Sequence, residues 1–477
     1  MHKWILCGAL LAVGCAPSLQ GNDPREPNQA ALPAGWTGAN GTTSVAQQTW
    51  SEFFKSGHLR RLIDDALKNN QEMNLQMQEV ILAQTEIAAR QGEYLPRLSA
   101  GANVGLEGVG KHTSQGRSDE AHGLSKTLGN FSFGLAGSWE IDVWGKLRNA
   151  TKAAKLRYAA SVEARNFLAT QLIAEIARSY FDLIALDQQI EVLERSIAIQ
   201  SDALEIVKLQ KQAARVTELA VQRFEAEVRK NQSRRYDLEQ ERVQAENRIN
   251  FLVGRYPQPV ARDAHELDNT LPTHVQTGLP ADLLQNRPDV RRAELQLEAA
   301  KLDAKAAKAA FYPSLSLDAS IGYRAFNVSH LLATPESLVY GLGAGLMAPL
   351  LNRSAITAQY RGANAVQMQA VLQYERTLLQ AFTDVANQLA MLGNLQKSYE
   401  LGAQQVDVLA QSIDTSNVLF QSARADYMEV LMTRRDSLEA QEKLIELRRR
   451  QWQALVGVYQ ALGGGWQSTE GNDTTKK

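Results

Sequence analysis

The sequence predicts a mainly α-helical protein that also carries four transmembrane β-strands and is built from two internal repeats. Apolar residues recur every seven positions from Leu378 to Phe420, which predicts a very long helix that supercoils with other helices. Four other segments alternate apolar residues with small or polar ones, as membrane strands do. Both kinds of segment occur in each half of the chain, in the same order, which indicates a duplication.

The composition excludes several classes of function. The 477 residues include 51 basic and 52 acidic side chains, so the bulk charge gives no reason to expect a nucleic-acid partner. The seven histidines lack metal-ligand spacing, and no catalytic combination of residues is recognisable. Glycines 341, 343 and 345 lie inside an alternating segment and do not precede a helix, so they do not form a phosphate-binding loop. We therefore expect no enzyme, no cofactor and no metal site.

The N-terminus is typical of a bacterial export signal. A short apolar run from Trp4 to Val13 follows a polar start and is too short to span a bilayer. Small residues then precede Cys15, so residues 1–14 are predicted to be a signal peptide and Cys15 the lipidated first residue of the mature chain. Ala16 stands where an Asp would favour inner-membrane retention, which indicates the outer membrane. An ordinary signal peptide cleaved nearby is the alternative.

Polar segments are expected at both ends of the mature chain. Residues 15–49 are rich in Pro, Gly, Asn and Ser, which predicts a tether without a core of its own. Residues 467–477 form a polar tail. Regular structure is expected to begin near Trp50, and helical spacing of apolar residues extends from Leu59 to Arg90.

The alternating segments predict four strands, at residues 98–106, 131–143, 315–323 and 338–348. Apolar and aromatic side chains occupy one face of each strand, and small or polar ones occupy the other, as in strands with a lipid-facing and a wet side. The polar stretches 107–126 and 324–337 are expected to be exposed loops. A soluble antiparallel sheet with one buried face is the alternative, but Trp139 and Trp144 favour a membrane interface.

Long helices are expected to fill most of the remaining chain. The stretch from Leu147 to Gln212 lacks Pro and Gly and is followed by a turn near 213–218 and a helix that returns to Leu252. A connector with four prolines spans 257–280. The heptad helix runs from Arg353 to Phe420, turns near 423–426, and is followed by a helix that ends near Leu462.

Matching positions in the two halves lie 217 residues apart, from 69 to 286, from 96 to 313 and from 105 to 322. The predicted repeats are residues 50–280 and 281–466. Because four strands cannot close a barrel, their edges in lipid would leave backbone groups unsatisfied, at several kcal/mol each. Two copies would give a barrel nearly filled by side chains, whereas three would enclose water. The polar strand faces favour a trimeric twelve-stranded barrel, continued by an α-helical coiled-coil tunnel.

Four motifs carry a resemblance to a known family. They are Trp50 with Phe53 and Phe54, the run at 139–148 (WEIDVWGKLR), the run at 286–294 (NRPDVRRAE) and the run at 311–315 (FYPSL). Together they resemble the TolC-like channel-tunnel proteins of the outer membrane, and most closely the OprM-type efflux lipoproteins. The resemblance covers residues 50–466.

This resemblance implies a homotrimer in the outer membrane that extends into the periplasm. It implies a passive exit duct for drugs or other small molecules. These would be delivered by an inner-membrane pump of the resistance-nodulation-division (RND) class through a periplasmic adaptor protein. Outer membrane lipid would surround the barrel.

The resemblance also implies a periplasmic tip, formed by the two turns between helices, that contacts the adaptor. The tip residues are Ala214, Arg215, Thr217, Ala423, Arg424 and Asp426. Family members commonly carry Gly at the positions of Ala214 and Ala423, so we expect a slightly stiffer tip.

A pore gate is implied just past the second turn, at Met428, Glu429 and Met432. Because Met432 stands where Asp is usual, the gate is expected to be less cation-selective, with Asp426 or Glu218 as possible sources of compensating charge. Two other functions stay open. One is a type I protein-secretion channel, and the other is a structural coiled-coil lipoprotein of the periplasm.

Overall fold

The structure is a computed structural model that describes residues 19, 25–27, 33, 35–36, 44–269, 271, 276–351, 353–422 and 424–467. The chain divides into two compact units. The sheet unit comprises Met1–Pro27, Ile81–Ala160 and Glu294–Gln373, and the helical unit comprises Asn28–Val80, Ser161–Ala293 and Tyr374–Lys477. Each unit is therefore assembled from both halves of the chain.

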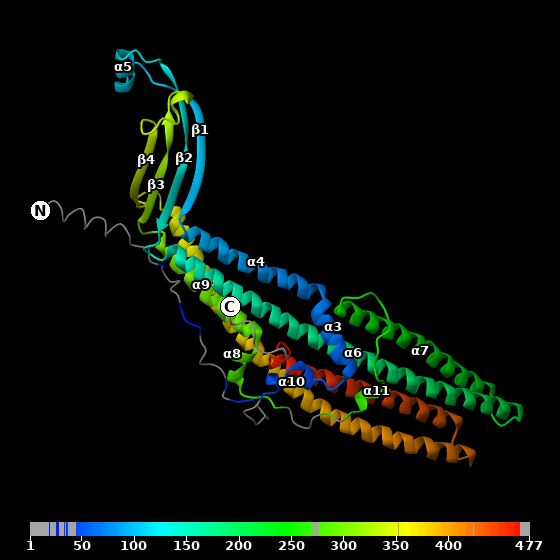
Figure 1. Cartoon of the computed structure of the whole chain (residues 1–477). Helices are drawn as coiled ribbons and strands as arrows, with labels where there is room; N and C mark the ends of the chain where they lie inside the picture. Colours follow the sequence, from blue (N-terminus) through cyan, green and yellow to red (C-terminus); the bar gives the residue numbers. More distant parts are fainter. Residues whose placement is uncertain are drawn as a thin grey trace. The chain divides into compact units, whose positions relative to one another are not determined.

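The sheet unit contains the four predicted strands, shown in Figure 1. They are β1 (Arg97–Gly108), β2 (Thr127–Ile141), β3 (Ser314–Ala325) and β4 (Leu338–Met347), and they pair antiparallel in the order β1-β2-β3-β4. The alternation in the sequence thus located every strand to within a few residues. Strands β1 and β4 are the two edges of this sheet, because each has a partner on one side only.

The loops between the strands are more regular than predicted. A short helix, α5 (Ser114–Ala121), lies in the loop after β1 and is capped by the Thr113 hydroxyl, which accepts the Gly116 N–H at 3.0 Å. A 3₁₀ turn, η5 (Val328–His330), lies between β3 and β4. Helix α5 was not predicted, because the loop is polar and Gly-rich and the N-cap residue Thr113 is only a weak helix signal in such a sequence.

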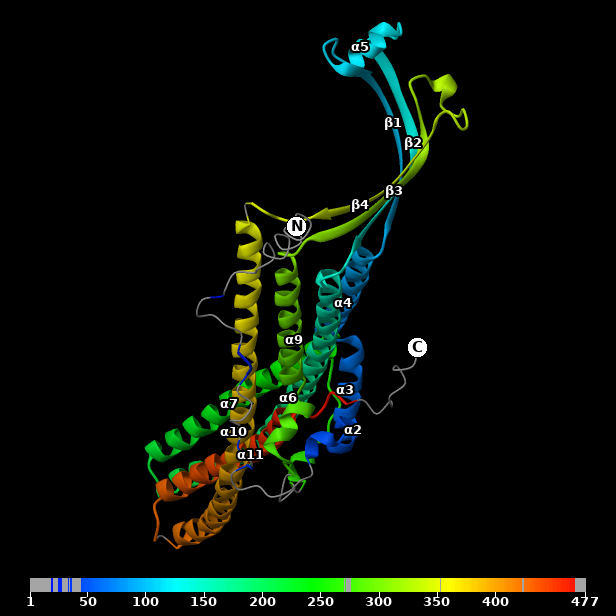
Figure 2. The same cartoon turned by 90° about the vertical axis from the view of Figure 1, so that its left-hand side faces the viewer.

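Two helical hairpins account for the longest elements of the chain, and both views show them (Figures 1 and 2). The first joins α6 (Lys146–Gln212) to α7 (Glu218–Val253), and the second joins α10 (Ser354–Gln421) to α11 (Tyr427–Ala461). Their bounds agree with the sequence prediction to within a residue or two. In the helical unit, the core includes fully buried side chains of α6, among them Ile173, Tyr180 and Leu183.

Two helical stretches are each broken by one residue, and the apolar spacing predicts the first of them as a single helix from Leu59 to Arg90. The first consists of α3 (Gly57–Asn69) and α4 (Gln71–Tyr94), and the second of α8 (Leu283–Asn286) and α9 (Pro288–Ala309). At the first break Asn70 is extended. Its amide nitrogen donates to the Leu252 carbonyl at 2.8 Å, and its amide oxygen accepts the Met73 N–H at 3.0 Å. The break thus ties this corner to the end of α7.

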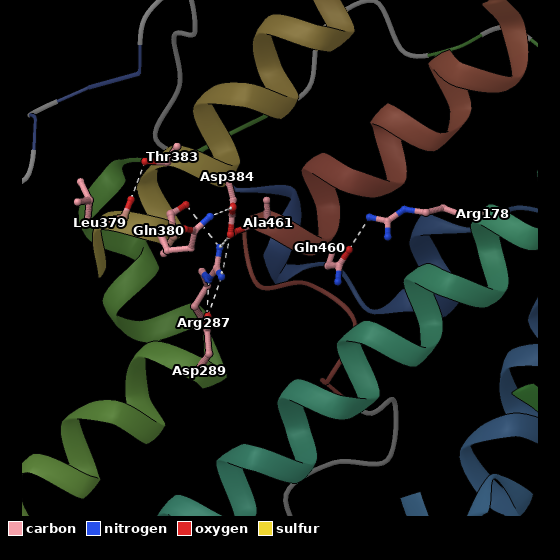
Figure 3. A network of polar contacts seen from close by, with 10 residues as sticks. Arg178, Arg287, Asp289, Leu379, Gln380, Thr383, Asp384, Gln460 and Ala461 are labelled. Carbon is pink, nitrogen blue, oxygen red and sulfur yellow. Dashed lines mark hydrogen bonds and ion pairs between the residues drawn. The ribbon is translucent and has the colours of Figure 1, made fainter. Parts of the chain in front are cut away.

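The second break is held by the buried guanidinium of Arg287, shown in Figure 3. It donates to Asp289 at 2.7 Å, to Asp384 of α10 at 3.3 Å and to the carbonyl of Ala461, at the end of α11, at 3.0 Å. Burial lowers the pKa of Arg287, but the hydrogen bonds and charges of the two aspartates outweigh burial, and the net shift is upward. Pro288 and Asp289 also suit a helix start, because Pro is tolerated at the first helical position and an acidic side chain in the first turn interacts favourably with the helix dipole.

A left-handed glycine closes the returning helix of each hairpin. Gly254 follows α7 with φ of 79°, and Gly463 follows α11 with φ of 89°. A Cβ on Gly254 would lie 2.5 Å from the Asn69 carbonyl oxygen, and one on Gly463 would lie 2.4 Å from that of Asn286. Both positions therefore exclude a side chain through conformation and through space.

The segments predicted as connector and tether contact the helical unit. In the connector, η3 (Glu266–Asp268) buries Leu267, whose carbonyl accepts from Arg448 at 2.9 Å and from Trp452 at 3.2 Å. In the tether, the buried ring of Trp36 stacks on Phe382 of α10 with centroids 4.9 Å apart. None of the helices in the described ranges has the length and apolar character needed to cross a membrane.

Candidate functional site

The sheet has one apolar face and one polar face. Cross-strand partners point to the same side of a sheet, so the register sorts the side chains of all four strands into two sets. Apart from Thr127 at one end, the first face carries only apolar, aromatic or Gly residues. Most of its large side chains are exposed, and Leu342 is 85% exposed. Such a large uncovered apolar surface requires an apolar partner.

The other face holds every charged residue of the four strands. They are Arg97, Glu107, Glu140, Asp318 and Arg324. Arg324 donates to Glu107 at 3.3 Å and to Asn130 at 3.1 Å, and Glu140 accepts from Lys146, the first residue of α6, at 2.9 Å. This polar face is the candidate wall of a water-filled path.

The first predicted tip residues lie in the turn between α6 and α7. Ala214 has φ of 56°, in the left-handed region that is unfavourable for residues with a Cβ. The Arg215 N–H donates to the Gln210 carbonyl and the Ala214 N–H donates to the Lys211 carbonyl, both at 2.9 Å. These two bonds form the Schellman motif that commonly ends a helix, usually with Gly at the Ala214 position. Thr217 is the N-cap residue of α7.

The second turn repeats part of this geometry. The Arg424 N–H donates to the Leu419 carbonyl at 2.9 Å. This bond spans five residues, as does the bond from Arg215 to Gln210 in the first turn. Asp426 caps α11, because its carboxylate accepts the Met428 N–H at 3.5 Å. Ala423, which was also assigned to the tip, lies outside the described residues.

A small apolar cluster joins the first turn to the start of α11. Its buried members are Leu204, Val207, Ala220, Val221, Phe224 and Leu431. They come from α6, α7 and α11, and Tyr427 and Met428 pack against the cluster from the side. The two turns are therefore connected by packing within one chain.

The three predicted gate residues have different surroundings. Met428 is half-buried, and its Sδ accepts from Nη1 of Arg223 in α7 at 3.1 Å. Glu429 and Met432 are exposed. A thioether is a weak acceptor, so this contact satisfies little of the hydrogen-bonding capacity of the guanidinium. Sequence reasoning missed Arg223, because nothing local indicates which residue of α7 faces Met428.

The charge expected from Glu218 is neutralised. Its carboxylate forms an ion pair with Lys211 across the first turn. The ion pair could have been predicted from the sequence, because the two opposite charges lie seven residues apart on either side of the predicted turn. Of the two groups considered for extra negative charge at the gate, Asp426 caps α11 and Glu218 is paired.

A model of the outer membrane efflux protein family matches residues 62–255 and 279–464 of the chain. The chain belongs to the outer membrane efflux protein family. Its location is therefore the outer membrane, and the matched segments include both hairpins and all four strands.

Relatives of known description agree with this assignment. OpmQ of Pseudomonas aeruginosa, a pyoverdine export outer membrane protein, is 28% identical over 442 residues, which cover 92% of each chain. SilC of Salmonella typhimurium, a probable outer membrane lipoprotein, is 26% identical over 417 residues, or 87% of this chain and 88% of its own. The open state of the MtrE outer membrane channel of Neisseria gonorrhoeae superimposes with a TM-score of 0.82 at 23% identity. That match covers 95% of this chain and 99% of MtrE, and it shows a shared fold.

No group of three or more His, Cys, Asp or Glu side chains is arranged to hold a metal ion within the described ranges. The predicted lipidation residue, Cys15, lies outside them.

Proposed function

We propose that this protein is the passive exit duct of an efflux system and that it works as a homotrimer. The observation that carries the proposal is the two-faced sheet with an edge at β1 and another at β4. In a membrane, each unpaired edge would leave backbone groups without partners. Three copies that pair β4 of one with β1 of the next remove all the edges and give a twelve-stranded barrel.

In this assembly the apolar face meets lipid and the polar face lines the bore. Repeats 50–280 and 281–466 each contribute two strands and one hairpin, so the barrel is continued by a ring of coiled helices. The sequence holds no phosphate-binding loop, and energy is supplied by an inner-membrane RND pump through a periplasmic adaptor. The cargo is a drug or another small molecule. The description of OpmQ as a pyoverdine exporter supports this class of cargo.

Three functional elements complete the proposal. The turns at Ala214, Arg215 and Thr217 and at Ala423, Arg424 and Asp426 meet the adaptor. Met428, Glu429 and Met432 narrow the resting pore. Lipidation at Cys15 anchors the N-terminus, as the lipoprotein description of SilC supports.

Cross-linking tests the assembly. The native cysteines, Cys7 and Cys15, both lie at the N-terminus, so new pairs can be read clearly. With Ala100→Cys fixed in β1, cysteines placed one by one along β4 should give covalent dimers and trimers on oxidation. Efficiency should alternate with a period of two, because alternate side chains share a face. Ser132→Cys in the internal strand β2 is the matched control and should give no ladder with β4.

Conductance tests the duct. Reconstituted protein should give small, discrete current steps, and Glu429→Ala should enlarge them. Trimers without any conductance would contradict the duct and favour a structural coiled-coil protein. Unchanged steps in every gate variant would contradict only the gate residues.

A further inference from the structure

The charged residues on the polar face divide into paired and unpaired ones. Glu107 is neutralised by Arg324 and Glu140 by Lys146, at 3.3 and 2.9 Å. For Arg97 and Asp318, the described structure records no ion pair, and the recorded partner of the Asp318 carboxylate is the hydroxyl of Ser316 at 3.3 Å. Among the charged residues of the four strands, Arg97 and Asp318 are therefore the two whose charge is not neutralised by a direct ion pair.

The register places the two unpaired charges in one row. Arg97 of β1 faces Ser138 of β2, Ser138 faces Asp318 of β3, and Asp318 faces Gly343 of β4. Neighbouring strands are roughly 4.8 Å apart, so the backbones of Arg97 and Asp318 are about 10 Å apart. This separation is close to the Debye length of about 10 Å at 0.1 M salt, so each charge partly offsets the other at that ionic strength.

The surroundings of Asp318 are open and polar. A hollow of about 430 Å³ on the sheet is lined by residues that include Ser99, Ser138, Asp318, Ser320 and Gly343. Gly343, the partner of Asp318 on β4, has no side chain, and a Cβ built there would meet nothing within 4 Å. A hydrated ion or a small polar solute can therefore approach Asp318 from the polar side.

We propose that Arg97 and Asp318 form a charge-compensated ring in the bore of the proposed duct. The inference rests on the proposed function, because it requires the polar face to line a conducting path. With one charge of each sign per chain at the same level, the ring does not select solutes by the sign of their charge. The sheet then passes small cations, anions and zwitterions alike, and its limit is one of size.

Ion selectivity tests the ring through neutral replacements. Reversal potentials in a KCl gradient are measured across planar bilayers for the wild type, Asp318→Asn, Arg97→Gln and the double variant. Asp318→Asn should shift the K⁺/Cl⁻ permeability ratio about twofold towards Cl⁻, and Arg97→Gln about twofold towards K⁺. One unit charge some 8–10 Å from the ion path in water has about a twofold effect on the local concentration of an ion, and screening by salt limits the combined effect of the three copies. The double variant should return to the wild-type ratio.

Two controls separate charge from structure. Ser138→Ala, in the same row, should leave the permeability ratio unchanged. Swelling of proteoliposomes in neutral sugars should be equal in all variants, which shows that the bore is intact. Equal swelling without opposite shifts in the two single variants would overturn the ring while leaving the duct in place. Absence of both current and swelling in the wild type would overturn the duct, and the ring with it.

Discussion

The two helix breaks perform the same task with different chemistry. At the first, the neutral amide of Asn70 reaches the Leu252 carbonyl at the end of α7. At the second, the guanidinium of Arg287 reaches the Ala461 carbonyl at the end of α11. Both breaks also pack a left-handed glycine against the carbonyl that precedes them. The backbone contact is thus the same in both halves, and the side chain that secures it differs.

This difference decides how many elements each break depends on. Asn70 satisfies its own amide with two backbone groups. Arg287 brings a charge into a site where it is only 6% exposed, so it needs Asp289 and Asp384 as well as the carbonyl. Because Asp384 belongs to α10, the second break couples α8 and α9 to both α10 and α11, whereas the first couples α3 and α4 to α7 alone. The buried charge of Arg287 therefore makes the second break depend on more partners than the first, and removing one of them should cost more free energy of folding.

The largest expected effect on stability comes from removing Arg287 at the second break. Arg287→Met leaves two carboxylates without their cation and should lower the free energy of unfolding by about 3–5 kcal/mol. Asn70→Ala, which leaves one carbonyl and one N–H unsatisfied, should lower it by about 1–3 kcal/mol. Denaturant titration of the purified protein, followed by helical circular dichroism, measures both.

An exposed arginine of α3 provides the control for this pair. Arg61→Met should change the free energy of unfolding by less than about 0.5 kcal/mol, because its partners are local and its side chain is exposed. Adding Asp289→Asn and Asp384→Asn to Arg287→Met should recover part of the loss, since these changes remove the unpaired charges. Equal losses for Arg287→Met and Arg61→Met would show that the cluster contributes no more than a surface arginine.

The glycines sharpen the comparison, because here the two halves should respond alike. Gly254→Ala and Gly463→Ala each force a Cβ to within 2.5 Å of a backbone carbonyl in a left-handed conformation. Each should lower the free energy of unfolding by about 2 kcal/mol or more. Gly393→Ala within α10 meets nothing within 4 Å and should be neutral or raise stability by about 0.5–1 kcal/mol. A loss at only one of the two caps would show that the two contacts are not equivalent.

Local periodicity predicted most of the fold. Strand alternation and heptad spacing depend on neighbours a few residues apart, so they located β1 to β4 and the long helices closely. The break at Asn70 escaped prediction, because apolar spacing continues through that position. Pro288 does indicate a helix start after Arg287, but the contacts that hold the two breaks could not be predicted from the sequence. The breaks are set by carbonyls of α7 and α11 that lie far away in the sequence.

The candidate site was less accessible to sequence reasoning. The polar strand face follows directly from alternation, and so do its charged residues. The pairing of these charges does not follow from alternation, because Arg324 of β3 reaches Glu107 of β1 across the intervening strand β2, and Glu140 pairs with Lys146 beyond its own strand. The contact of Arg223 with Met428 likewise joins α7 to α11, between residues that are 205 positions apart in the sequence. Such pairings depend on tertiary packing that no single segment encodes.

A substitution in the turn between α6 and α7 should have a smaller effect and should raise the stability. Ala214 occupies a left-handed conformation that Gly adopts without strain, so Ala214→Gly should raise the free energy of unfolding by about 1 kcal/mol. Ala213→Gly, one residue earlier, should instead lower it by about 0.5–1 kcal/mol, because it only adds freedom to the unfolded chain. Thermal unfolding of the two variants side by side measures the contrast. Stabilisation by both substitutions would argue against strain at Ala214.

A buried carboxylate in α11 should respond to pH. The returning helices match at an offset of 209 residues, the separation of Gly254 and Gly463, and at this offset the first repeat carries Ser233 in place of Glu442. Glu442 is 7% exposed, and one of its oxygens accepts no hydrogen bond from the described residues. Burial raises its pKa, and this effect outweighs Arg234 of α7, 2.7 Å away, and Lys230, which lower it. Glu439 raises it further. An acid with a raised pKa stabilises the fold below its ordinary value, and that contribution is lost as pH rises through the folded pKa.

Glu442→Gln should therefore make the protein more stable than the wild type at pH 8, and the difference should shrink as the pH falls towards 4.5, the ordinary value for Glu. Midpoints of thermal unfolding between pH 5 and 8 provide the measurement. Glu225→Gln, at an exposed position of α7 next to Arg229, serves as the matched control and should show no such convergence. If Glu442→Gln were the less stable protein at pH 8, attraction to Arg234 would outweigh burial. Glu442 would then hold α11 to α7 in the way that Arg287 holds the second break, through a buried ion pair.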